Sequence, residues 1–105
     1  MINKNFLEYV KNKKVVIVGP ANYILNFNNG DYIDSYDIVV RINRGVELTN
    51  IYPNSLGTKT NILYNCMVES PDNGGIININ FLKKHRLDWI CTLPRCNYQG
   101  LSKSN

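Results

Sequence analysis

Short apolar runs alternate with polar segments along the chain, and this pattern predicts several strands. Four β-branched residues stand in a row at 15–18 and end at Gly19, which is typical of a strand buried on both faces of a parallel sheet. Similar runs predict further strands over residues 36–43, 60–65 and 87–94. We therefore expect a sheet of about four strands.

Apolar residues at helical spacing lie between these runs. They predict helices over residues 3–12, 22–27 and 76–85. Phe6, Leu7 and Val10 share one face of the first helix, and Ile77 and Phe81 share one face of the last. The polar segments between the helices and strands predict a turn and two loops, at 28–31, 44–59 and 69–75.

Strands separated by helical segments predict an α/β fold, in which right-handed crossovers join a Rossmann-like parallel sheet with flanking helices. We expect one domain over residues 1–105 with a polar C-terminal tail at 95–105. Ligands of such sheets bind beyond the carboxyl ends of the strands. If the first three strands are neighbours, their carboxyl ends border one crevice.

The residues at these carboxyl ends are the candidate binding site. Gly19 lets a ligand approach the backbone, and the amides that follow it could bind a phosphate. Asn43 offers one acceptor and two donor hydrogens, which suit a ribose hydroxyl or a phosphate oxygen. We predict that the site is formed by Gly19, Pro20, Ala21, Arg41 and Asn43.

Structural roles compete with each of these assignments. Gly19 also fits a plain turn, and asparagine commonly ends strands and caps turns. An ion pair between Arg41 and Asp34 or Asp37 competes with phosphate binding by the same guanidinium. We expect Asp34 and Ser35 to cap or brace the turn before the second strand.

Composition and charge narrow the function classes. The chain has an apolar content of 44% and a net charge of +4, which fit a globular domain and permit an anionic ligand. Its basic residues are scattered, so we do not expect it to bind nucleic acid. Three cysteines (Cys66, Cys91 and Cys96) lack zinc-site spacing, so we expect reduced thiols and no metal or other cofactor. Because no apolar stretch suits a signal peptide or membrane span, we expect a soluble, cytoplasmic protein.

The stretch VVIVGPANYIL, followed by GDYIDSYDIVVRINRG, resembles the large sialyl motif of the sialyltransferases, glycosyltransferase family 29. That motif has a strand ending V-G, then G-x-x-I-D-S-x-D, an apolar strand and R-x-N. The chain has these residues in the expected order and spacing, as Gly30, Ile33, Asp34, Ser35, Asp37, Arg41 and Asn43. The resemblance covers residues 14–65, with weaker support to residue 94.

The resemblance implies that this chain is the N-terminal part of a sialyltransferase-like, variant GT-A domain. Family members transfer sialic acid from CMP-sialic acid to an acceptor glycan, with inversion and without a metal. By this resemblance, Asn43 lines the nucleotide site and Gly19 admits the nucleotide close to the backbone. The residues with a structural role in the motif are then Gly30, Asp34, Ser35 and Asp37.

The chain departs from the family pattern at three places. Pro20 stands where animal members often have an asparagine, and it contributes neither a side-chain amide nor an N–H. Val15 replaces the motif cysteine of animal members, so the chain resembles the bacterial or viral branch. Family members use a later histidine as general base, whereas His85, the single histidine here, lies in a predicted helix among basic residues. We therefore assign no catalytic residue.

Three hypotheses follow. The first is the donor-site half of a sialyltransferase-like enzyme, truncated before the catalytic histidine and active only when missing segments or a partner chain complete it. The second is a non-catalytic module that binds a nucleotide or nucleotide sugar, and the third is a plain α/β scaffold. We also expect marginal stability or self-association, because the sheet ends at its fourth strand with an unpaired edge, where Trp89 and Ile90 lack their normal neighbours.

Overall fold

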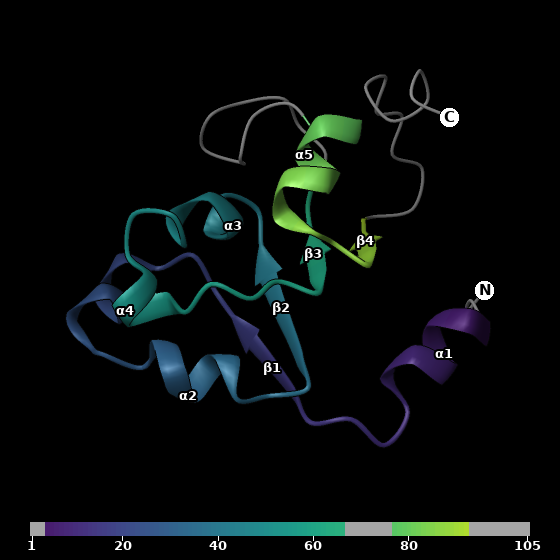
Figure 1. Ribbon diagram of the computed structural model, residues 1–105, viewed down its shortest axis with the longest axis horizontal. Coiled ribbons are helices and arrows are strands. Elements are labelled where there is room, and N and C mark those ends of the chain that lie inside the picture. Colours follow the sequence, from purple (N-terminus) through teal and green to yellow (C-terminus); the bar gives the residue numbers. More distant parts are fainter. Residues whose placement is uncertain (1–3, 67–76, 93–105) are drawn as a thin grey trace.

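The computed structural model describes residues 4–66 and 77–92 (Figure 1). Its centre is a parallel sheet of four strands in the order β1-β2-β3-β4. The strands are β1 (Val15–Val18), β2 (Ile38–Ile42), β3 (Ile62–Tyr64) and β4 (Trp89–Cys91). The predicted Rossmann-like α/β fold is confirmed, and each strand lies within its predicted segment.

The predicted helices are present, with one change of type. The structure has α1 (Lys4–Val10), the 3₁₀ helix η1 (Asn22–Asn26) and α5 (Ile79–His85). Asn78 caps the start of α5, because its side chain accepts a hydrogen bond from the backbone N–H of Phe81. None of the helices in the described part of the chain has the length and apolar character needed to cross a bilayer.

Three short helices replace segments that we predicted as turn or loop. They are α2 (Gly30–Asp34), α3 (Gly45–Leu48) and α4 (Pro53–Leu56). Each is only about one turn long, so no apolar repeat can reveal it in the sequence. α4 does carry a helix-start signal, because Pro53 occupies its first position, where a missing N–H costs nothing.

One face of the sheet carries the core of the protein. Strands that follow one another in order, joined by right-handed crossovers, place their connecting helices on the same side. Two apolar clusters lie there. The first contains Val18, Ile33, Val39 and Leu56, and the second contains Val46, Leu63 and Ile77 with Phe81, Leu82 and Ile90 packed against it. Ile77 and Phe81 therefore share one apolar surface, as predicted.

The opposite face is covered only in part. α1 lies on the β4 side of the sheet, across the molecule from α2 and α4 (Figure 1). Its residues Phe6 and Tyr9 pack against Trp89, with ring centroids 5.3 and 6.1 Å from the indole. On β1, Val15 is 40% exposed and Ile17 is 67% exposed.

These contacts correct two expectations. A strand buried on both faces is wrong for β1, because β1 lies at the edge of the sheet and only one face carries connecting helices. The sheet of the described residues does end at β4, as expected, but Trp89 and Ile90 are not without neighbours there. Trp89 contacts two aromatic rings of α1, and Ile90 packs against the second apolar cluster.

Candidate functional site

The carboxyl ends of β1, β2 and β3 lie side by side at one edge of the sheet. Val18 pairs with Arg41, and Ile42 pairs with Tyr64 in the next strand. Gly19 therefore lies one position beyond the first pair, and Asn43 one position beyond the second. The structure brings the predicted strand ends together, as the sequence required for a shared crevice.

Asn43 ties the ends of β2 and β3 to each other. Its backbone N–H donates to the carbonyl of Tyr64 at 2.9 Å, and its Oδ1 accepts from the backbone N–H of Cys66 at 3.0 Å. Its φ of 49° is in the left-handed region, which asparagine tolerates better than most residues do. The strand-ending role that we considered for Asn43 is confirmed, and it holds the carboxamide at the candidate site.

The backbone at Gly19 borders open space. A Cβ built on Gly19 would meet no heavy atom within 4 Å, so the fold itself does not require a glycine here. Pro20 is half-buried, and Ala21 is exposed and immediately precedes η1. The space beside this backbone is what a ligand in close approach would need.

Arg41 is fully buried and braces the segment before β3. Its Nε donates to the Lys59 carbonyl at 3.1 Å and to Thr60 Oγ1 at 3.0 Å, and its Nη2 donates to the same carbonyl at 2.8 Å. Nη2 also lies 4.0 Å from Asp34 Oδ1, so the predicted ion pair forms with Asp34. Burial lowers the pKa of Arg41 to about 10, and Asp34 opposes that shift.

Asp34 holds a loop that is distant in the sequence. Its carboxylate accepts hydrogen bonds from the backbone N–H groups of Thr58 and Lys59, the shortest at 2.9 and 3.0 Å. Gly57, with φ of 75°, lies so close that a Cβ there would be 2.4 Å from Asp34 Oδ1. Our expectation that Asp34 braces the turn before β2 is therefore corrected, because its partners lie between α4 and β3.

The remaining motif residues also form internal contacts. A Cβ on Gly30 would lie 2.4 Å from the Pro53 carbonyl, so only glycine allows α2 to approach α4 this closely. Ser35 ends α2, and its hydroxyl donates to the Tyr32 carbonyl at 2.6 Å. Asp37 accepts from the backbone N–H of Lys14 at 2.9 Å, which joins the starts of β1 and β2. We call the contacts of Gly30, Asp34, Asp37 and Arg41 the framework.

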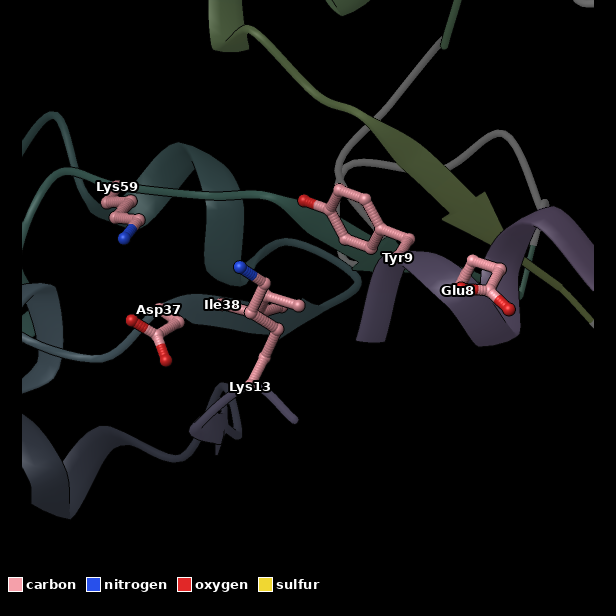
Figure 2. A pocket seen from close by; sticks show the side chains of 6 residues that line it. All are labelled: Glu8, Tyr9, Lys13, Asp37, Ile38 and Lys59. Atoms are coloured by element: carbon pink, nitrogen blue, oxygen red, sulfur yellow. The ribbon is translucent and has the colours of Figure 1, made fainter. Parts of the chain in front are cut away.

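A separate cleft of about 520 Å³ lies at the amino-terminal edge of the sheet (Figure 2). It is lined by Glu8, Tyr9, Lys13, Asp37, Ile38 and Lys59. Figure 2 shows the Tyr9 hydroxyl turned toward Lys13 and Ile38, while Glu8 points away. This hydroxyl donates to Asp88, and Lys59 Nζ donates to the Tyr36 carbonyl at 2.6 Å. None of the five residues predicted for the binding site lines this cleft.

Other reactive side chains lie away from Gly19. His85 is the last residue of α5, which confirms a helix-end position, and its ring packs against the Phe81 ring at a tilt, with centroids 4.6 Å apart. Burial and the charge of Lys84 lower the pKa of His85. Cys66 and Cys91 are free thiols, and burial raises the pKa of Cys91. The described residues contain no group of three His, Cys, Asp or Glu side chains that could hold a metal ion.

Sequence reasoning missed the residues that complete the framework. These are Gly57, Thr58 and Lys59, which lie in the predicted loop at 44–59, and Thr60, the first residue of the predicted strand at 60–65. Most of their bonds use backbone atoms, which leave no trace in the residue types. The glycine of LGTKT was the one available signal in the sequence, because glycine often stands where φ is positive or where another group comes close to the backbone.

Comparison with known proteins gives one family. A family model described as glycosyltransferase family 29 (sialyltransferase) matches residues 3–93 of the chain. The match includes β1 to β4, the framework and the strand ends with Gly19 and Asn43. Comparisons with curated proteins and with solved structures gave no significant match. The bacterial or viral branch stays a prediction.

Proposed function

The chain belongs to glycosyltransferase family 29, the sialyltransferases, and we propose that it forms the donor-binding half of such an enzyme. The donor is CMP-sialic acid or a related nucleotide sugar, and the acceptor is a glycan. One observation supports this proposal most: Gly19 and Asn43 lie on neighbouring strands at the edge where parallel sheets bind ligands.

The two residues would bind the donor in different ways. The open space beside Gly19 lets the nucleotide approach the chain, where the backbone of Ala21 also lies exposed. Because Asn43 Oδ1 is bonded to Cys66, a ligand would meet the NH₂ group of this carboxamide, which is a donor suited to phosphate or ribose oxygens. Pro20 would offer the donor only van der Waals contact, because it has neither an N–H nor a polar side chain.

Arg41 has a different place in this proposal. Its guanidinium is bonded to Lys59 and Thr60 and buried within the framework, so we infer that it supports the strand end instead of meeting the donor directly. Direct contact of Arg41 with a phosphate stays the weaker alternative. It would have to use Nη1, the nitrogen of this guanidinium that makes no hydrogen bond with the described residues, and Nη1 is buried away from solvent.

Transfer of the sugar needs more than donor binding. A general base that removes the acceptor hydroxyl proton typically contributes about a hundredfold to ten-thousandfold in rate. His85 ends α5 and packs against Phe81, and we do not assign it this role. We propose that the base comes from another segment or a partner chain, and that these residues alone bind the donor without turning it over.

A binding experiment with matched variants tests the proposal. Isothermal titration with CMP and with CMP-sialic acid should show binding that Asn43→Asp abolishes, because aspartate keeps the acceptor for Cys66 but removes the donor and adds charge beside the phosphate. Gly19→Val should also abolish binding by filling the open space. Asn50→Asp, an exposed control with the same charge change, should bind normally.

The outcomes separate three possibilities. No binding of either ligand at millimolar concentration, with a folded protein by circular dichroism, contradicts the donor site. Binding without transfer in a radiolabelled-donor assay agrees with the donor-binding half. Transfer by this chain alone would show that a base is present after all.

A further inference from the structure

The cleft at the amino-terminal edge of the sheet is large enough for a small molecule. Its volume of about 520 Å³ falls within the range of about 300–1,000 Å³ that is typical of small-molecule sites. Its residues Lys13 and Asp37 precede β1 and β2, whereas Gly19 and Asn43 follow the last residues of these strands. We call it the amino-terminal cleft, and a ligand there would use none of the residues proposed for the donor site.

Two ammonium groups face the amino-terminal cleft. Figure 2 shows the Lys13 ammonium group between the Tyr9 hydroxyl and the Lys59 side chain. Lys13 Nζ forms no hydrogen bond or ion pair with the described residues. Lys59 Nζ donates one hydrogen to the Tyr36 carbonyl at 2.6 Å, so two of its three hydrogens remain for a ligand. The cleft therefore offers two cations that have no carboxylate partner within the described part of the chain.

The same cleft also offers hydrogen-bond acceptors. Asp37 accepts from the Lys14 N–H at Oδ2, while its Oδ1 makes no hydrogen bond with the described residues. The Tyr9 hydroxyl gives its hydrogen to Asp88, so toward a ligand this oxygen can only accept. Glu8 points away from the cleft (Figure 2). A ligand that satisfies the cleft must therefore bring donor hydrogens as well as negative charge.

The charges of the cleft favour a ligand with one negative charge. Two lysines and one aspartate face the cleft, so these three side chains carry a net charge of +1. A carboxylate bonded to both ammonium groups balances that charge. A phosphate monoester carries close to two negative charges at neutral pH, and Asp37 would repel the second one.

We propose that the amino-terminal cleft binds a hydroxylated monocarboxylate of about the size of a sugar acid. Lys13 and Lys59 bind its carboxylate through charge-assisted hydrogen bonds. Asp37 and the Tyr9 oxygen accept from its hydroxyl groups, and Ile38 lies against its ring. This inference does not rest on donor binding, because the two sites lie at opposite ends of the strands and share no residue.

A titration with four probes tests the proposal. Glucuronate carries both the carboxylate and the hydroxyl groups, whereas methyl glucoside lacks the carboxylate, acetate lacks the hydroxyl groups and glucose 6-phosphate carries the second charge. Isothermal titration at low salt should show a Kd for glucuronate of about 1 mM or below, at least about tenfold tighter than for each of the other three probes. In ¹⁵N spectra, glucuronate should shift the amides of Lys14, Asp37 and Lys59 and leave that of Gly19 in place.

Two lysine variants locate the site. Lys13→Met should weaken glucuronate about tenfold or more, because one of the two ammonium groups is lost while a long side chain is kept. Lys11→Met is the matched control, since Lys11 is exposed, lies two positions earlier and does not line the cleft. It should bind glucuronate like the wild type. Both variants should keep the wild-type circular dichroism spectrum and the same affinity for CMP.

A third variant tests the preference for a single charge. Asp37→Asn keeps an oxygen acceptor for the Lys14 N–H and removes the negative charge beside the ligand. The preference for glucuronate over glucose 6-phosphate should therefore fall about tenfold. A purely structural role of Asp37 would change the stability of the protein and leave this preference as it is.

Four outcomes would overturn the proposal. They are no binding of glucuronate at about 20 mM, equal binding of any other probe, unchanged glucuronate affinity in Lys13→Met, and displacement of glucuronate by CMP. Equal binding of acetate would show non-specific ion pairing, and displacement by CMP would place glucuronate at the Gly19–Asn43 edge. CMP affinity is measured separately, so a failure of this proposal is distinguishable from a failure of the donor site.

Discussion

The framework and the Gly19–Asn43 edge differ in how much the fold depends on them. In the framework, Asp34 and Arg41 have several internal partners each, and Gly30 leaves no room for a side chain. At the edge, Gly19 borders open space and no internal contact explains its identity, while Asn43 joins two strand ends through its N–H and Oδ1 and leaves its NH₂ group for a ligand. One sequence motif therefore combines residues that hold the fold with residues that are available to a ligand.

Removing the Asp34 carboxylate should have the largest effect. Asp34→Ala takes an acceptor from two backbone N–H groups and leaves the buried Arg41 without its counter-charge. We expect a loss of about 2–4 kcal/mol in the free energy of unfolding, reduced from the fully buried case because the Asp34 side chain is 27% exposed. Urea unfolding followed by circular dichroism measures this loss.

Asp31→Ala is the matched control for that experiment. Asp31 is exposed in the first turn of α2, so its loss should cost about 0.5 kcal/mol or less. Equal unfolding midpoints for the two variants would contradict the structural role of Asp34 in the framework.

Replacement of Gly30 or Gly19 by alanine should affect stability very differently, although by less than the loss expected for Asp34→Ala. Gly30→Ala places a Cβ 2.4 Å from the Pro53 carbonyl, which forces α2 and α4 apart and should cost about 1–3 kcal/mol. Gly19→Ala meets no neighbour, so its stability should stay within about 0.5 kcal/mol of wild type. Urea midpoints of both variants test this, and a larger loss at Gly19 would reverse our assignment.

Within the framework, the smallest expected loss of stability is at Asp37, which lies at its exposed rim. Asp37→Ala removes one hydrogen bond, the one from the Lys14 N–H, at an exposed position. We expect a loss of about 1 kcal/mol or less, because water replaces the lost acceptor. Amide hydrogen exchange at Lys14 should accelerate while exchange in β3 stays unchanged. A loss as large as that of Asp34→Ala would show that the Asp37 contact matters as much to the fold as the Asp34 contacts do.

The sequence predicted the sheet well and its covering poorly. Runs such as VVIV and IVVRI identified β1 and β2 because β-branched residues mark strands directly, and short apolar runs identified β3 and β4. The exposure of Ile17 could not be foreseen, since the same apolar run suits a strand with one covered face or two. Which faces are covered depends on the strand order, and the sequence does not encode that order locally.

The candidate site was also predicted only in part. The strand ends with Gly19 and Asn43 were predicted correctly, because the carboxyl ends of parallel strands meet at one edge. The choice of Asp34 over Asp37 as the partner of Arg41 was not resolved in the sequence. It depends on a loop around Thr58 that brings backbone amides to Asp34. Hydrogen bonds from backbone amides leave no pattern of residue types in the sequence.

The sequential strand order has a consequence for how the protein is made. Paired residues such as Val15 and Ile38, Val40 and Ile62, or Ile62 and Trp89 are 23, 22 and 27 positions apart. Each strand can therefore join its neighbour soon after it leaves the ribosome, without waiting for distant parts of the chain. The sheet therefore grows in one direction during synthesis, from β1 toward β4. At each stage the strand made last forms the edge with which the next strand pairs.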